Sequence, residues 1–139
     1  QFPHWKGRGY EIAGFAWWQG DKDRYNLAHA KKYEENLVHL IKTLRREFKA
    51  PKAKFIVATL GQTAKDSTDL NEKLILDAQL AVDGAAGKYS DFKGNVGSVF
   101  THPLSQGGAS NSHYNGNAQT YMDVGLAMGE AMVRLLQGE

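Results

Sequence analysis

Three short apolar runs, each bounded by turn residues, divide the chain. They cover residues 11–18, 54–60 and 95–102. A short apolar run bounded in this way is typical of a strand that is covered on both faces of a sheet. The third run stops at Pro103, which cannot donate a hydrogen bond to a sheet ladder. We therefore predict three strands.

Between the runs, apolar residues repeat with the period of an amphipathic helix. The first helix must end at Pro51, because proline interrupts the helical hydrogen bonds. The second begins at Asp69, an N-cap residue with Glu72 three positions on, and ends at Gly84. The apolar face of the first helix is predicted to carry Tyr33, Leu37, Leu40, Ile41, Leu44 and Phe48, and that of the second Leu70, Leu74, Ile75, Ala78 and Val82.

The last helical segment has an apolar side that contains two glycines. The spacing of Gly125 and Gly129 also occurs in paired membrane helices. Because the flanking residues are polar, we instead expect this side to pack closely on the sheet. It comprises Met122, Gly125, Leu126, Gly129, Val133 and Leu136.

The order strand–helix, repeated three times, predicts the fold class. Such alternation favours a parallel sheet with right-handed crossovers and helices on both faces. The prediction is a three-layer α/β/α domain with a doubly wound parallel sheet of about three strands. Sheets usually have about 4–6 strands, and the chain begins at Gln1 without an initiator Met. We therefore expect residues 1–139 to be the C-terminal portion of a larger domain that does not fold alone.

Composition narrows the function classes. The chain has 139 residues, 42% hydrophobic and 23% charged, which indicates one globular domain. A net charge of +2 without long basic runs makes nucleic acid and anionic membranes poor partners. The absence of cysteine excludes disulfides, a thiolate nucleophile and a zinc ribbon. No apolar run approaches the roughly 18 residues of a membrane span.

Polar residues gather where the predicted strands end. In open α/β sheets, sites lie at the carboxyl ends of the strands, and three segments reach that edge: 19–26, 61–63 and 103–117. His113 follows a small-residue loop and precedes a helix, a position suited to a general base. His102 closes a strand and is either a structural histidine or a site residue. Ser105 lacks the first glycine of a nucleophile elbow, and the five histidines show no zinc-binding spacing.

The first strand end allows two interpretations. Trp17 and Trp18 must face opposite sides of the sheet, and each either packs in the core or offers a stacking surface to a sugar. Asp21 and Asp23 are either capping carboxylates ahead of the helix or members of the site.

Residues 17–23, Trp-Trp-Gln-Gly-Asp-Lys-Asp, resemble a known family signature. The signature is W-x-Q-G-E-x-N/D of SGNH hydrolases of the sialate O-acetylesterase type, which includes carbohydrate esterase family 6. The likeness continues from Tyr33 to Arg45, resumes at residues 56–61, and returns at His113 and the helix that follows. It implies the flavodoxin-like SGNH fold and a serine esterase that removes acetyl groups from carbohydrate without a metal or organic cofactor.

The resemblance also implies roles for individual residues. Gln19 aligns with the side chain that helps form the oxyanion hole, and His113 aligns with the base. The nucleophilic serine would come from an upstream segment or a companion chain that completes the sheet. Family members are often exported, so the resemblance implies a secreted or periplasmic protein. The expected substrate contacts are Trp18, Gly20, Gln62 and Asn111.

One departure from the family pattern leaves alternatives open. The usual Asp-x-x-His block here reads Ser110-Asn111-Ser112-His113. Either Asp21 or Asp23 orients the histidine, or the site works as a Ser–His dyad, or strong activity has been lost. The alternative function is a catalytically degenerate carbohydrate-binding or scaffold module with the same fold. A phosphate-binding flavodoxin-like protein is disfavoured, because no glycine-rich loop opens a helix at a strand end.

Overall fold

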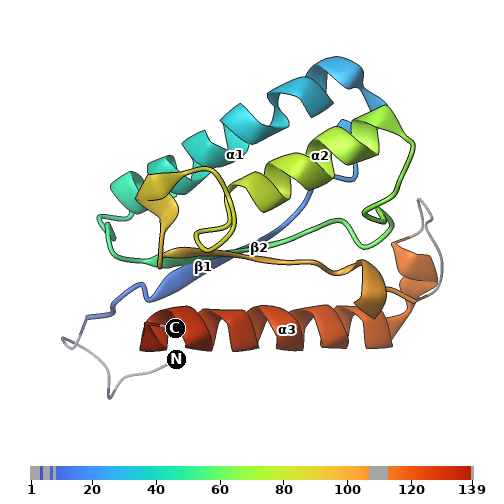
Figure 1. Ribbon diagram of the computed structural model, residues 1–139. Helices are drawn as coiled ribbons and strands as arrows, with labels where there is room; N and C mark the ends of the chain where they lie inside the picture. Colours follow the sequence, from blue (N-terminus) through green and yellow to red (C-terminus); the bar gives the residue numbers. More distant parts are fainter. Residues whose placement is uncertain (1–3, 5–6, 8, 107–112, 139) are drawn as a thin grey trace.

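A central parallel sheet separates two helical layers in the computed structural model, which describes residues 4, 7, 9–106 and 113–138 (Figure 1). The strands β1 (Gly14–Trp18), β2 (Lys54–Ala58) and β3 (Val96–Val99) pair in the order β1-β2-β3. Helices α1 (Leu27–Glu47) and α2 (Leu70–Ala81) cover one face, and α3 (Ala118–Gln137) covers the other. The predicted α/β/α architecture with a parallel sheet of three strands is confirmed.

The strands are shorter than the apolar runs that predicted them. Pairing between β1 and β2 starts at Gly14 opposite Lys54 and ends at Trp18 opposite Ala58. After β2 ends at Ala58, the N–H of Thr59 still donates to the carbonyl of Val99 at 2.9 Å, but the N–H of Leu60 donates to the Gln79 side chain at 3.1 Å. The second and third apolar runs therefore extend past the ladder into the segments that build the carboxyl edge.

Side-chain caps define where α1 and α2 begin. Oδ1 of Asn26 accepts hydrogen bonds from the N–H groups of Ala28 and His29 at 2.8 and 3.3 Å. The predicted cap of α2 is confirmed, since Asp69 accepts from the N–H of Glu72 at 2.9 Å. These caps satisfy donors that the first turn of a helix leaves unpaired.

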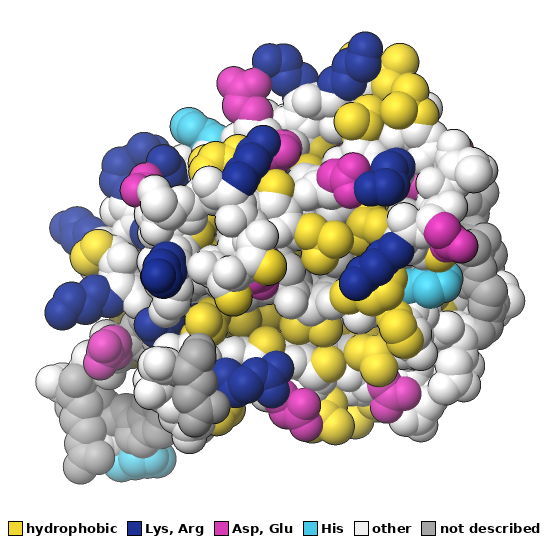
Figure 2. Space-filling model, viewed as in Figure 1, with side chains coloured by type: hydrophobic (Ala, Val, Ile, Leu, Met, Phe, Trp, Pro, Cys, Tyr) yellow, Lys and Arg dark blue, Asp and Glu magenta, His cyan; other side chains and the backbone are white. Residues whose placement is uncertain are grey.

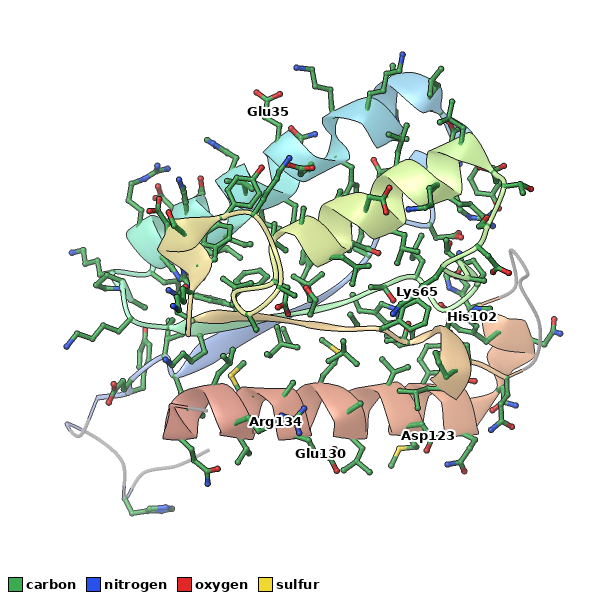
Figure 3. The ribbon with its side chains drawn as sticks, viewed as in Figure 1. Glu35, Lys65, His102, Asp123, Glu130 and Arg134 are labelled. Carbon is green, nitrogen blue, oxygen red and sulfur yellow. The ribbon has the colours of Figure 1, made fainter. Side chains whose placement is uncertain are left out.

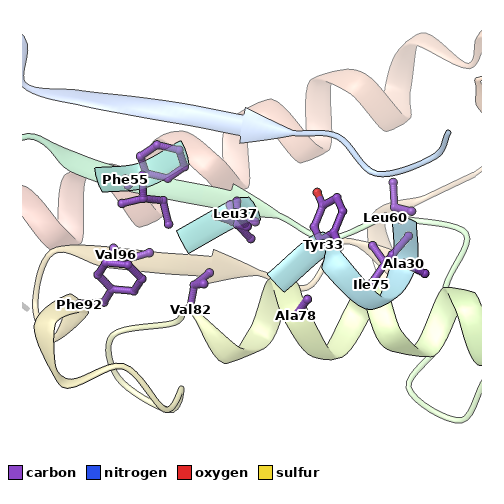
Figure 4. Close-up of a cluster of buried hydrophobic side chains, with 12 residues drawn as sticks. Ala30, Tyr33, Leu37, Phe55, Leu60, Ile75, Ala78, Val82, Phe92 and Val96 are labelled. Carbon is purple, nitrogen blue, oxygen red and sulfur yellow. The ribbon is translucent and has the colours of Figure 1, made fainter. Parts of the chain in front are cut away.

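The main core lies between the sheet and the pair α1 and α2. Figure 4 shows Phe55, Val96 and Phe92 at one end of this core and Tyr33, Leu60 and Ile75 towards the other. Burying each such large apolar side chain contributes about 1.5–3 kcal/mol. A smaller cluster beneath α3 joins Ile56 to Ala131 and Leu135.

The face of α3 that packs on the sheet is not the predicted one. Met122 and Leu126 are 70% and 65% exposed, and a Cβ at Gly125 or Gly129 would have no neighbour within 4 Å. Figure 2 shows hydrophobic side chains reaching the surface along the lower part of the view, where α3 lies in Figure 1. The buried residues of α3 are Thr120, Val124, Ala131 and Leu135.

A glycine in β1 helps to explain this choice of face. A Cβ at Gly14 would lie 2.5 Å from Cε and 2.7 Å from Sδ of Met132. The bare backbone of Gly14 makes room for the Met132 side chain, so the sheet receives the side of α3 that carries it. Among the helices that the structure describes, none is both long and apolar enough to span a membrane.

Candidate active site

A pocket of about 420 Å³ lies at the carboxyl edge of the sheet, beside the start of α3. The end of β1, the end of β2 and the turn before α3 contribute its walls. Gln19, Asp21 and His113, far apart in the sequence, all line it, and so do Trp18 and Gly20. The complete lining is Trp18, Gln19, Gly20, Asp21, Lys22, Leu60, His113, Tyr114 and Tyr121.

A buried glutamine holds two strand ends together behind this pocket. Gln79 of α2 is fully buried, and its Nε2 donates to the carbonyl oxygen of Gln19 at 2.8 Å. Its Oε1 accepts from the N–H of Leu60 at 3.1 Å. The hydroxyl of Tyr33, whose pKa is raised by burial, donates to the same Gln19 carbonyl at 2.7 Å. Both helices on this face thus fix the backbone of Gln19.

Replacing Gln79 by leucine is expected to lower the free energy of unfolding by about 1–3 kcal/mol, because the buried N–H of Leu60 loses its acceptor. Denaturant unfolding followed by circular dichroism measures this loss. Gln119→Leu is the matched control, since the Gln119 amide bonds to Asp123 on the exposed surface of α3. Equal stability of the two variants would contradict the role of Gln79.

The side chain of Gln19 lies between two cavities. Its Nε2 donates to Oδ2 of Asp23 at 2.6 Å. Asp23 lines a second cavity of about 400 Å³ on the α1 side, together with Trp17 and Leu37. The two tryptophans therefore face opposite sides of the sheet, as strand alternation requires, with Trp17 toward α1 and Trp18 in the pocket of His113.

Asp21 is engaged with an arginine and an amide. Its Oδ1 accepts from Nε of Arg24 at 2.8 Å and from Nε2 of Gln62 at 2.7 Å. Arg24 continues to Oε1 of Glu72 at 2.8 Å, which ties the segment after β1 to α2. Of the two predicted acids, Asp21 shares the pocket of His113, whereas Asp23 is bonded to Gln19 beside the second cavity.

Three aromatic rings form one wall of the pocket. Tyr114 stacks on Trp18 with ring centroids 5.7 Å apart, and Tyr121 lies 5.5 Å from Trp18. Nε1 of Trp18 donates to the carbonyl of Thr59 at 3.1 Å, which fixes the orientation of the indole. Such a wall offers an apolar surface with polar edges to a ligand. The sequence prediction included Trp18 but missed both tyrosines, although Tyr114 directly follows the candidate base.

The turn that carries His113 has an unusual backbone. His113, Tyr114 and Asn115 have φ values of 50°, 56° and 52°, and Gly116 continues the run at 66°. The left-handed region is uncommon for residues other than glycine, and such strain clusters at functional sites. The hydroxyl of Tyr121 donates to the carbonyl oxygen of His113 at 3.0 Å and so helps to hold the turn.

The remaining predicted positions lie around the pocket or beyond it. Gln62 is behind the wall, bonded to Asp21 and Tyr114. His102 lies with Lys65 near the end of β3 (Figure 3), where its Nδ1–H donates to the carbonyl of Gly61 at 2.8 Å, a structural contact. Asn111 and Ser110 fall outside the described residues. In the described part of the chain, no group of three His, Cys, Asp or Glu side chains is placed to hold a metal ion.

Comparisons with known proteins agree with this architecture. Residues 4–134 match the family model described as "Carbohydrate esterase, sialic acid-specific acetylesterase". The fold is similar to the X-ray structure of a protein from Arabidopsis thaliana, with a TM-score of 0.68 and 22% sequence identity. That similarity covers 92% of this chain and 47% of the Arabidopsis chain, so this chain spans about half of its length. The comparison with curated proteins gave no match.

Proposed function

Because this chain belongs to the carbohydrate esterases described as sialic acid-specific acetylesterases, we propose that the complete protein is a serine esterase that removes acetyl groups from carbohydrate. The observation that carries the proposal is the common pocket of Gln19 and His113 at the carboxyl edge of the sheet. An amide donor and an imidazole at one pocket are two of the three groups that acyl transfer needs. The third is the nucleophile.

In the proposed mechanism, His113 takes the proton of the serine hydroxyl as its oxygen attacks the acetyl carbonyl. The C=O electron pair moves to the carbonyl oxygen, which becomes an oxyanion. Gln19 has two N–H bonds on Nε2, and one is held by Asp23 at 2.6 Å. The other is left to donate to that oxyanion. His113 then returns the proton to the departing sugar oxygen, and water hydrolyses the acetyl-serine by the same steps.

The nucleophile is proposed to arrive on a strand beside β1. In the sheet formed by the described residues, β1 pairs with β2 along one edge, which leaves the N–H and C=O groups of its other edge for a further strand. The cavity lined by Trp17, Leu37 and Leu40 adjoins this side and would accept an apolar side chain. The Arabidopsis chain, about twice as long, supports a larger domain. An upstream segment or a companion chain would supply this strand.

Acetate release by the complete protein tests the proposal directly. The substrates are an O-acetylated sialic acid and an acetylated neutral oligosaccharide, each compared with its deacetylated form. Release from either substrate is the expected result. The wall of Trp18, Tyr114 and Tyr121 also favours a second candidate, a carbohydrate-binding module without turnover. Sugar binding without any acetate release would overturn the esterase and support the module.

Gln19→Ala in the complete protein is expected to lower kcat by about 10²–10³, the usual effect of removing one oxyanion donor. KM should change far less, because the donor binds charge that develops in the transition state. Gln119→Ala, which deletes a surface amide of α3, is the matched control. A fall in kcat/KM that comes wholly from a higher KM would show that Gln19 binds the ground state instead.

A further inference from the structure

The hydroxyl of Tyr114 ties the turn before α3 to the end of β2. Its oxygen accepts a hydrogen bond from the N–H of Gly61 at 3.1 Å, and its proton is donated to Oε1 of Gln62 at 3.0 Å. Burial raises the pKa of Tyr114, so the hydroxyl keeps the proton that the second bond needs. Because Tyr114 directly follows His113, these bonds determine where the imidazole enters the pocket.

Asp21 fixes the amide of Gln62 from the opposite side. Its Oδ1 accepts from Nε2 of Gln62 at 2.7 Å and from Nε of Arg24 at 2.8 Å. An amide whose NH₂ group donates to Asp21 must turn its oxygen toward Tyr114. Asp21 therefore orients the Gln62 amide so that its Oε1 accepts the hydrogen bond from Tyr114.

The turn needs this anchorage because its backbone is strained. Left-handed residues other than glycine persist only where their surroundings hold them, and His113 and Tyr114 both have this conformation. A close approach at β2 makes room for the anchor, since a Cβ at Gly61 would lie 3.1 Å from the Tyr114 ring and 1.8 Å from Oγ of Ser105. Among the side chains that the structure describes, Asp21, Gln62 and Tyr114 thus form one connected path to His113.

We propose that Tyr114, Gln62 and Asp21 are positioning residues that hold His113 in the pocket, and that Asp21 acts through Gln62 and Tyr114 rather than as the carboxylate partner of the imidazole. The proposal rests on the proposed function, because it takes His113 as the general base. It assigns Asp21 the role of a hydrogen-bond acceptor, for which its negative charge is not required.

Acetate-release kinetics of four variants of the complete protein test this. Tyr114→Phe keeps the ring on Trp18 and deletes the hydroxyl, and it is expected to lower kcat by about 10²-fold, as misplacement of a reacting group does, with KM unchanged. Asp21→Ala should have a similar effect. Asp21→Asn should restore much of the loss, because the amide oxygen of asparagine can still accept from Gln62 and Arg24. Tyr89→Phe, which deletes a hydroxyl bonded to Glu34 away from the pocket, should match wild type.

Three results would overturn the proposed positioning of His113 by Tyr114, Gln62 and Asp21. The first is an unchanged kcat in Tyr114→Phe. The second is an Asp21→Asn variant as impaired as Asp21→Ala, which would show that the carboxylate charge acts directly. The third is a loss of kcat that merely follows the folded fraction, measured by circular dichroism at the assay temperature. Full activity of His113→Ala would instead overturn the proposed function itself, so the two failures are distinguishable.

Discussion

His113→Ala in the complete protein is expected to remove nearly all acetyl release, with a fall in kcat on the order of 10⁴–10⁶-fold, as for other members of a nucleophile–base unit. Without the imidazole, the described lining of the pocket has no histidine to take the serine proton and return it to the sugar oxygen. Measurement of kcat and KM on an acetylated sugar checks this expectation.

Binding and stability should survive the same substitution. The His113 side chain lies at the surface of the pocket, and the turn stays anchored through the hydroxyls of Tyr114 and Tyr121. His39→Ala on α1 is a suitable control, because it deletes an imidazole away from the pocket. If neither the wild type nor any variant releases acetate, and His113→Ala binds sugar as the wild type does, the result supports the binding module instead of the esterase.

Residues 1–139 expressed alone are expected to lack a sharp cooperative unfolding transition. In the described sheet, β1 has an unpaired edge, and a cavity lined by Trp17, Leu37 and Leu40 lies on that side. The outer side of α3 adds exposed apolar residues, including Met122 and Leu126. Folded proteins normally cover such edges and patches, because they drive association.

Thermal unfolding with analytical ultracentrifugation measures this expectation. The complete protein, or the isolated chain mixed with the segment that supplies the further strand, should unfold in one sharp transition. A soluble monomer of residues 1–139 with the same sharp transition would contradict it, and the proposed strand beside β1 would then lose its main support.

The layers could be predicted from the sequence because each depends on local periodicity. The runs at β1 and β2 are nearly continuous in apolar residues, and α1 repeats with a helical period, so neither the strands nor the helix needs long-range information. The packed face of α3 could not be predicted in the same way. Both sides of that helix are apolar, and the choice between them depends on the room that Gly14, in a strand far away along the chain, leaves for Met132.

For the site, the sequence indicated which residues meet but not which side chains hold them in place. The rule that parallel strands end at one edge, together with the family resemblance, led to the expectation that Gln19 and His113 meet, and both residues line one pocket. Side-chain partners lie beyond that rule. From its polarity, Gln79 of α2 would be expected to face solvent, but it is buried. The reason is its hydrogen bonds to the backbone of Leu60 and Gln19, which sequence patterns do not reveal. Likewise, the role of Tyr114 comes from its hydrogen bonds to Gly61 and Gln62, which follow β2 and are far from Tyr114 in the sequence.

The clustered rings of Trp18, Tyr114 and Tyr121 are also expected to have a spectroscopic consequence. Their ring centroids lie 5.5–5.9 Å apart in one fixed arrangement, and we expect the cluster to contribute to the near-ultraviolet circular dichroism. That contribution depends on the turn at 113–116 being seated against the end of β1. The seated population can therefore be followed by spectroscopy with no acetylated sugar present, before any substrate is known.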